Sequence, residues 1–327
     1  MNIKALESWF LSHQRDLNFR KSKDPYHIWV AEIMLQQTRA ETVEPYFERF
    51  ISAYPDVSTL AGAKEDELKR LVEGIGYYRR FSLMLKAAKY IQENHQGVFP
   101  KTYEEVKALP GVGDYTAGAI MSFAYNKPHS AVDGNVIRVL SRYLGETGDM
   151  RKSSERNKIV AFNQQAIKKA HPDLYSVALI ELGALVCRPK NPLCEQCPLH
   201  AHCYAYENQL TDKIPYLSKL KKQRELNYIV FVIEDQDHYY LIKREEALLQ
   251  GMYAYPQFEK ESINAALDAL DELGISLSHH AFMASYKHIF SHQIWMMDVY
   301  HATLIGDAHQ NLIRVPKSKI GEIPMAI

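Results

Sequence analysis

The chain has 327 residues, with 39 basic and 39 acidic side chains, so its formal net charge is zero. A content of 46 % apolar and 24 % charged residues excludes a disordered or collagen-like chain, and the length predicts about two domains. No run approaches the roughly 18 apolar residues of a membrane helix, and the N-terminus lacks a signal-peptide core. We therefore expect a protein of the reducing cytoplasm without a membrane partner.

The charge is divided unevenly along the chain. Residues 1–225 hold 32 Lys and Arg against 26 Asp and Glu, whereas residues 226–327 hold 7 against 13. A basic part next to an acidic part indicates that the first part meets a polyanion such as nucleic acid. Solvated faces often carry an imbalance of this size, so the indication is weak by itself.

The sequence up to residue 225 predicts one helix after another. The first is an apolar helix over residues 26–38, with Asp24 as its cap and Pro25 at its first position. Apolar residues at helical spacing predict further helices over residues 42–54, 66–73, 81–94, 115–125, 135–144, 155–170 and 174–186. No alternating strand pattern occurs in this part, which we predict to be all-α.

The pattern changes after a polar, Lys-rich segment at residues 209–225, which resembles a linker. Residues 228–233 and 238–243 are typical of paired strands, residues 263–273 of a helix, and residues 294–303 of another strand. The sequence therefore predicts a small α/β domain over residues 226–327.

All four cysteines lie in one loop, spaced as C-x6-C-x2-C-x5-C at Cys187, Cys194, Cys197 and Cys203. A reducing compartment disfavours two disulfides. Structural zinc sites commonly pair two short C-x2-C turns, whereas here one such turn lies between two wider spacings. Four thiolates in this arrangement suit an iron–sulfur cluster, so the spacing favours a cluster over zinc.

A glycine-rich hairpin is predicted in residues 109–120, which read LPGVGDYTAGAI. Gly111 and Gly113, on either side of Val112, allow a phosphate to approach the backbone, and the N-terminus of the following helix favours anions. An ordinary tight turn between helices is the alternative. A second Gly-x-Gly at residues 74–76 is followed by two tyrosines and two arginines, which suits base stacking beside a backbone grip.

Asp133 stands in the sequence VDGN, directly before the apolar face of a helix. The ordinary interpretation makes Asp133 or Asn135 the N-cap of that helix. A cap does not require Gly134 between them, and a glycine there would let a substrate come close.

Glu32 is unusual because its helical neighbours are apolar. An ionised carboxylate in such surroundings is costly unless it is paired, and Arg15 or Arg20 is the available partner. Without a partner, the pKa of Glu32 would rise and the group would stay protonated near neutrality. A protonated glutamic acid and an ionised aspartate together form the general pattern for cleaving a glycosidic bond.

The hairpin, the VDGN segment and the four-cysteine loop together resemble the helix–hairpin–helix DNA glycosylase superfamily with an iron–sulfur cluster. Within it, AEIMLQQT, EGIGYYRR, AVDGNVIRVLSR, ELGALVC and HIFSH (residues 288–292) resemble the MutY family of adenine DNA glycosylases. That family removes adenine mispaired with 8-oxoguanine or guanine. The resemblance is dense over residues 1–225 and thinner beyond.

The resemblance implies a mostly α N-terminal part and a small α/β Nudix-like domain. The first part would be a six-helix barrel with a helix–hairpin–helix at about residues 105–126 and an iron–sulfur loop at residues 187–203. The second, at residues 226–327, would recognise 8-oxoguanine. Its region after Pro256 lacks the Glu-rich metal-binding core of a Nudix hydrolase, so pyrophosphatase activity is not expected.

The resemblance also implies catalytic roles. Glu32 would protonate adenine at N7, and Asp133 would stay ionised and stabilise the oxocarbenium-like sugar of the flipped nucleotide. Tyr115 and Asn135 would position the carboxylates or the attacking water. Endonuclease III-like enzymes carry a lysine where Tyr115 stands, and tyrosine cannot form the imine that leads to strand scission. A monofunctional glycosylase is implied.

The implied partner is double-stranded DNA with adenine opposite 8-oxoguanine or guanine, bound by a monomer. The implied cofactor is a [4Fe–4S] cluster on the four cysteines. The resemblance assigns contacts with the DNA or the lesion to Gln37, Thr38, Ile75, Tyr77, Gly111, Val112, Gly113, Phe290, Ser291 and His292. Among these, Ser291 is expected to hydrogen-bond 8-oxoguanine, although a plain strand end is the alternative for that triplet.

The chain departs from the family pattern at three places: LNFR at residues 17–20 replaces LPWR, Ile75 replaces a leucine, and Arg79 replaces a small residue. The first and last bear on DNA contacts. Two alternative functions stay open at this point. One is a glycosylase for another mismatch, such as thymine opposite guanine, and the other is a non-catalytic iron–sulfur protein that binds DNA.

Overall fold

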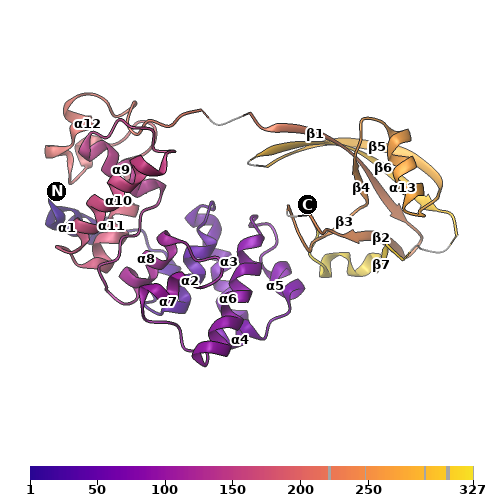
Figure 1. Cartoon of the computed structure of the whole chain (residues 1–327), viewed down its shortest axis with the longest axis horizontal. Coiled ribbons are helices and arrows are strands. Elements are labelled where there is room, and N and C mark those ends of the chain that lie inside the picture. Colours follow the sequence, from indigo (N-terminus) through magenta and orange to yellow (C-terminus); the bar gives the residue numbers. More distant parts are fainter. Residues whose placement is uncertain (220–221, 247, 291, 307–309, 327) are drawn as a thin grey trace. The chain divides into compact units, whose positions relative to one another are not determined.

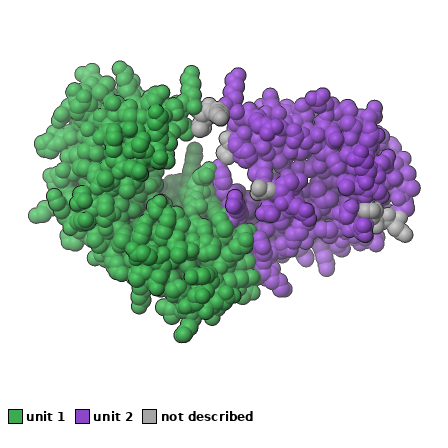
Figure 2. Space-filling model, in the orientation of Figure 1, with its two compact units in different colours: residues 1–63, 80–219 green, residues 64–79, 220–327 purple. Residues whose placement is uncertain are grey.

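The computed structural model describes residues 1–219, 222–246, 248–290, 292–306 and 310–326. The chain forms two compact units, one of residues 1–63 and 80–219 and the other of residues 64–79 and 220–327 (Figure 2). In the described residues, no helix combines the length and the apolar character needed to cross a membrane.

Helices make up the ordered elements of the chain as far as residue 219 (Figure 1). They are α1 (Ile3–His13), α2 (Pro25–Met34), α3 (Ala40–Ala53), α4 (Val57–Ala61), α5 (Glu65–Leu71), α6 (Arg79–His95), α7 (Tyr103–Lys107), α8 (Asp114–Phe123), α9 (Gly134–Leu144), α10 (Ser153–Ile167), α11 (Pro172–Leu185) and α12 (Tyr204–Glu207). Three 3-10 turns, η1 (Asn18–Arg20), η2 (Cys194–Gln196) and η3 (His200–His202), lie between them. The predicted all-α character is confirmed.

The remainder of the chain is a mixed sheet with one α-helix. Its elements are β1 (Arg224–Glu234), β2 (His238–Lys243), β3 (Tyr253–Ala254), β4 (Gln257–Glu259), α13 (Ile263–Glu272), β5 (Leu277–Ile289), β6 (Gln293–Leu304), β7 (Ile313–Pro316) and η4 (Lys317–Glu322). The strand order is β3-β2-β1-β6-β5, with β4 beside β1 and β7 beside β2. The pair β1 and β6 is parallel, and β5 and β6 are antiparallel.

One face of this sheet is covered by α13. Ala266 and Leu270 of the helix are buried with Ile229 and Phe231 of β1 and Ala302 of β6. Strands β1, β2 and β6 and helix α13 were predicted, and the structure confirms them. Strand β5 was missed because most of its side chains are exposed and its sequence LSHHAFMASYKHI has no alternation of apolar and polar residues.

The first half of the segment predicted as a linker, residues 209–225, packs against the helical unit. Ile214 is buried, and the amide of Met150 donates to the carbonyl of Tyr216 at 3.0 Å. The amide of Ser218 donates to Asp149 at 3.1 Å. This stretch packs on the helical unit because its backbone supplies partners to that unit, a property that polar composition does not reveal.

Helix packing brings the two carboxylate-bearing segments together through two glycines. A Cβ on Gly118 of α8 would lie 2.1 Å from the carbonyl oxygen of Ser130, just before the VDGN segment. A Cβ on Gly183 of α11 would lie 2.5 Å from the Cβ of Asn135 on α9. Only glycine permits these approaches, so both residues help to place Asp133.

Candidate active site

Glu32 is the buried centre of the site. It lies on α2, which begins at Pro25 after the Asp24 cap, and its side chain has no exposed surface. Arg20 forms an ion pair with it, with Nη1 at 2.7 Å from Oε1, and the hydroxyl of Tyr115 donates to Oε2 at 2.7 Å. Both carboxylate oxygens therefore have a partner.

Of the two alternatives that the sequence left open for Glu32, the structure has the paired carboxylate. Of the two arginines considered, Arg20 is the partner, whereas Arg15 donates to Glu181 at 2.8 and 2.9 Å. The guanidinium of Arg20 offsets the cost of burying a carboxylate. The sequence left this alternative open, because residues 12 positions apart can meet only through a turn that it does not specify.

Tyr115 connects the buried glutamate to the hairpin helix α8. Burial, together with the charges of Glu32 and Asp133, raises the pKa of Tyr115 well above its ordinary value. The hydroxyl therefore stays neutral and donates to Glu32, which orients the carboxylate.

Asp133 is the N-cap of α9 and also faces the site. It accepts from the amide of Val136 at 2.8 Å and from Nδ2 of Asn135 at 2.7 Å. Burial raises its pKa above the usual value, the two hydrogen bonds oppose this rise, and the charge of Glu32 adds to it. The structure thus brings Glu32, Tyr115, Asp133 and Asn135 into one electrostatic group.

Two arginines of α9 connect this group to the cysteine loop, and the sequence analysis did not single them out. Arg138 donates to Oδ1 of Asn135 at 2.8 Å and to the carbonyl of Cys187 at 2.7 Å. Arg142, one helical turn on, donates to the carbonyl of Arg188 at 2.7 Å and to Sγ of Cys187 at 3.4 Å. Their spacing of four residues on a helix flanked by VDGN was the only available signal.

The four cysteines are unbridged thiols of intermediate burial. Burial and the charges of the other three raise the pKa of Cys197 to about 12 in the chain without a cofactor, while an amide hydrogen bond opposes the rise. The four sulfurs thus influence one another electrostatically. Within the described residues, however, no group of three or more His, Cys, Asp or Glu side chains has a geometry that could hold a metal ion.

Gly111 and Gly113 shape the hairpin between α7 and α8, where the sequence predicts that the backbone approaches a phosphate. Gly111 has φ +78°, and a Cβ there would lie 2.8 Å from Leu83. Both the backbone conformation and the lack of space therefore favour glycine. Gly113 is the N-cap of α8, with open space around its Cα. The amide of Val112 is already used, because it donates to the carbonyl of Leu109 at 3.1 Å. The DNA contact that the resemblance assigns to Val112 stays a prediction.

The loop after α2 is shaped by Arg80, one of the two arginines after the second Gly-x-Gly, for which the sequence suggested a role in DNA binding. Arg80 is buried and donates to the carbonyls of Ile33 and Met34 at 3.0 and 2.7 Å, to the carbonyl of Gln36, and to Oγ1 of Thr38 at 3.0 Å. These bonds explain why α2 ends at Met34 rather than at residue 38. Gln37 follows with φ +58°.

The second Gly-x-Gly lies in the segment 64–79. Ile75 is buried with 6 % exposure, whereas Tyr77 is 47 % exposed and has φ +52°. Tyr77 therefore presents a much larger surface to a ligand than Ile75 does.

Phe290 and His292 lie at the turn between β5 and β6, and Ser291 lies outside the described residues. The amide of Phe290 donates to the carbonyl of Gln293 at 2.9 Å, and its ring packs against Trp295 with centroids 4.7 Å apart. Phe290 and His292 therefore lie between two antiparallel strands, and the lesion contact expected of Phe290, Ser291 and His292 stays a prediction.

Comparison with known proteins matches this fold to two families. Residues 30–163 match the HhH-GPD superfamily base excision DNA repair protein, and residues 229–327 match the NUDIX domain. An adenine DNA glycosylase of Buchnera aphidicola subsp. Schizaphis graminum is 32 % identical over 287 residues, which cover 87 % of this chain and 82 % of that protein. The chain belongs to the adenine DNA glycosylase family. It is therefore an enzyme of base excision repair.

Other relatives extend the adenine DNA glycosylase match. The Schizosaccharomyces pombe protein is 30 % identical over 88 % of this chain and 74 % of its own length. The Rattus norvegicus protein is 39 % identical over 62 % of this chain, which corresponds to 41 % of that protein. A solved thermostable thymine-DNA glycosylase aligns with TM-score 0.57 and 25 % identity over 63 % of this chain and 95 % of its own. An endonuclease III–DNA complex aligns with TM-score 0.52 and 23 % identity over 64 % and 94 %, which shows a shared fold.

Proposed function

We propose that this adenine DNA glycosylase hydrolyses the N-glycosidic bond of adenine mispaired with 8-oxoguanine or guanine in double-stranded DNA, without cutting the strand. The observation that carries the proposal is the group formed by buried Glu32 and half-buried Tyr115 and Asp133, in which a 2.7 Å hydrogen bond joins Tyr115 to Glu32 and the three side chains influence one another electrostatically. Two carboxylates in different surroundings are what glycosidic cleavage needs.

Adenine must leave the base stack before it reaches these groups, at a cost of a few kcal/mol that a mismatch lowers. In the chain without DNA, Arg20 neutralises Glu32. In the proposed mechanism Glu32 carries a proton taken from solvent when the extruded base enters, and the hydroxyl of Tyr115 holds Oε2 in place. Glu32 then donates that proton to N7, and the electron pair of the breaking C1′–N9 bond moves to the base.

Asp133 supplies the charge that the sugar then requires. Its anionic side chain, held by the Val136 amide and the Asn135 amide group, stabilises the oxocarbenium-like C1′. Water adds to C1′, and the proton that it releases restores the acid form of Glu32. Tyr115 has no amine, so no imine forms and the strand stays intact.

The cysteine loop fits a [4Fe–4S] cluster better than zinc. Structural zinc sites commonly pair two short C-x2-C turns, whereas this loop has one such turn between two wider spacings. A cluster of four irons is wider and takes four separate thiolates, and all four thiols are unbridged. Cys187, Cys194, Cys197 and Cys203 would hold it, and its role there is to fix the loop that Arg138 and Arg142 join to α9.

We expect the purified protein to be brown and to contain about four iron atoms per chain. Cys197→Ala is expected to lower the iron content and the thermal midpoint, because the loop between Cys187 and Cys203 then loses its support. Metal analysis and visible absorbance check this prediction. A colourless protein that contains zinc and is fully active would contradict it.

The Nudix-like part is proposed to read the base opposite adenine. Ser291→Ala and Phe290→Ala are expected to reduce the preference for 8-oxoguanine over guanine more than they slow excision, because the turn between β5 and β6 lies on a different unit from Glu32 and Asp133. Single-turnover rates on duplexes with the two opposite bases measure the preference. An equal loss on both would count against this assignment.

The proposed function is tested with duplexes that carry adenine opposite 8-oxoguanine, guanine or thymine, and thymine opposite guanine. Alkali after incubation should cut the strand at adenine opposite 8-oxoguanine or guanine, and omission of alkali should leave it intact. Cutting without alkali would contradict monofunctional chemistry. Release of thymine in place of adenine would favour the other mismatch reading, and no release at all would favour a DNA-binding protein without catalysis.

A further inference from the structure

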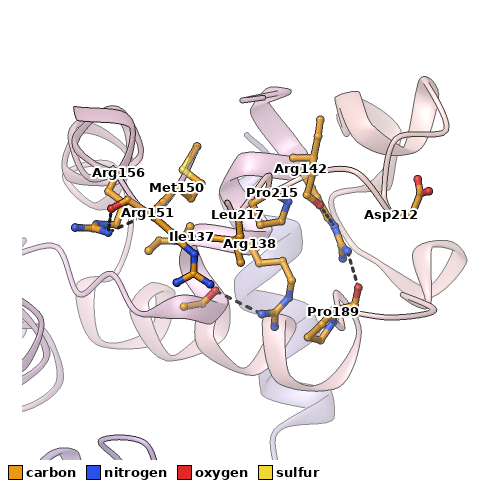
Figure 3. Close-up of a pocket in the computed structure, with 12 residues that line it drawn as sticks. Ile137, Arg138, Arg142, Met150, Arg151, Arg156, Pro189, Asp212, Pro215 and Leu217 are labelled. Carbon is orange, nitrogen blue, oxygen red and sulfur yellow. Dashed lines mark hydrogen bonds between the residues drawn. The ribbon is translucent and has the colours of Figure 1, made fainter. Parts of the chain in front are cut away.

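A basic pocket of about 530 Å³ opens beside the start of α9. Four arginines line it: Arg138 and Arg142 from α9, and Arg151 and Arg156 from the turn before α10 and from α10 itself (Figure 3). Arg138 and Arg142 stand in the AVDGNVIRVLSR motif, whereas Arg151 and Arg156 belong to no motif that the sequence predicted to have a function. The pocket lies within the helical unit, and it is separate from the buried surroundings of Glu32.

Arg151 and Arg156 donate to carbonyl oxygens. Arg151 donates through Nε to the carbonyl of Ser218 at 2.6 Å, and Arg156 donates through Nη1 to those of Met150 and Arg151 at 3.2 and 2.9 Å. Carbonyls satisfy donors but do not neutralise charge. In the described chain, no carboxylate lies within 4.0 Å of any of the four guanidinium groups.

The four arginines differ in how many of their guanidinium N–H donors are available to a ligand. Arg142 is buried, and its three nitrogens all donate, two of the bonds being to the carbonyls of Ile214 and Thr211. Arg151 is exposed, and its Nη1 and Nη2 have no acceptor among the described residues. Nε and Nη2 of Arg156 likewise have no acceptor among the described residues. A guanidinium with both terminal nitrogens available matches a phosphate in the bidentate manner.

The pocket has one lining carboxylate, Asp212, among the residues described. Figure 3 shows Asp212 at the opposite end of the pocket from Arg151 and Arg138, whose side chains point toward the same part of it. The arginine end therefore carries an unbalanced positive charge, which suits an anion.

The position of the pocket indicates which anion it takes. Gly134, the neighbour of Asp133, lines the pocket, and a Cβ there would meet nothing within 4 Å. Asp133 faces the sugar of the extruded nucleotide in the proposed mechanism, so the phosphates of that nucleotide must pass close to Gly134. We propose that Arg151, supported by Arg156, binds a backbone phosphodiester of the adenine-bearing strand next to the extruded nucleotide. This inference rests on the proposed function.

A phosphate contact of this kind has a measurable salt dependence. Each neutralised phosphate of a duplex contributes about 0.9 to the slope of log binding constant against log salt concentration. Arg151→Gln is therefore expected to reduce the slope by about one and to weaken binding similarly for every opposite base. Lys158→Gln is the matched control, because Lys158 lies on α10 and is already paired with Glu155 at 2.7 Å.

Duplexes with a single neutral methylphosphonate linkage locate the contact. Wild-type protein should lose affinity when the neutral linkage replaces a phosphate next to the target adenine, and Arg151→Gln should lose nothing further on that duplex. An unchanged slope and an unchanged pattern of sensitivity in Arg151→Gln would overturn the inference. Failure of the wild type to excise adenine would instead contradict the proposed function, so the two failures are distinguishable.

Inorganic phosphate is the second probe, since the same guanidinium chemistry would serve a ligand that is not DNA. Phosphate replaces chloride at constant ionic strength, and its binding to wild type and to Arg151→Gln is measured by calorimetry. Binding that Arg151→Gln abolishes, together with sensitivity to one methylphosphonate, supports the DNA assignment. Binding of phosphate without any methylphosphonate effect would assign the pocket to a free phosphate-bearing ligand and overturn the inference.

Discussion

Asp133→Asn is expected to lower the single-turnover rate of adenine excision by at least about 10³-fold while the duplex stays bound. The substitution removes the negative charge that the oxocarbenium-like sugar needs. Asparagine is as good an N-cap as aspartate, so the bond from the Val136 amide, 2.8 Å in the structure, can persist. Rapid-quench measurement of the rate, with a separate binding titration, checks both halves of this expectation.

Asp56→Asn is the matched control. Asp56 is the N-cap of α4 and accepts from the amide of Thr59 at 2.7 Å, far along the chain from the site residues. The same substitution there should leave the excision rate unchanged. If Asp133→Asn retained most of the rate, Asp133 would be only a helix cap. The hypothesis of a DNA-binding protein without catalysis would then be favoured.

Glu32→Gln is expected to slow excision by about 10²- to 10⁴-fold, the usual contribution of a positioned general acid. Glutamine can still accept from the Tyr115 hydroxyl, but it cannot deliver a proton to N7. The variant should also be less stable, by up to about 3 kcal/mol, because the guanidinium of Arg20 loses its carboxylate. The rate must therefore be measured well below the unfolding midpoint of the variant.

Glu181→Gln separates the two effects. Glu181 is also a buried glutamate, with 3 % exposure, and it is paired with Arg15 at 2.8 Å. Its substitution should cause a similar loss of stability but leave the excision rate near that of the wild type. If both variants slowed excision equally, the loss would reflect the broken ion pair rather than a missing proton donor.

The burial of Glu32 could be predicted from the sequence, but its ion-pair partner could not. The apolar neighbours of Glu32 in one helix predicted its burial, and the structure confirms it. The partner could not be predicted, because Arg20 reaches Glu32 through the 3-10 turn η1, whereas Arg15 reaches α11. Helical periodicity fixes which face is apolar, but it does not fix which of two nearby cations meets that face.

The same limit applies to residues that act through the backbone. The glycines of the hairpin could be recognised by their spacing, and Gly111 indeed has φ +78°. Arg80, Arg138 and Arg142 could not, because their partners are carbonyls of distant segments and any residue has a carbonyl. Strand β5 was missed for a related reason, since an exposed edge strand needs no alternating pattern.

The central claim is that excision needs a proton on N7 of adenine, and a substrate without that nitrogen tests it most directly. The duplex carries 7-deaza-2′-deoxyadenosine opposite 8-oxoguanine, which keeps the pairing face but offers no acceptor at position 7. We predict that wild-type protein binds this duplex but excises the analogue no faster than Glu32→Gln excises adenine. The Glu32→Gln variant should excise the analogue and adenine at the same rate, because it has no proton to deliver to either base. Excision of the analogue by wild-type protein at its normal rate would contradict the account.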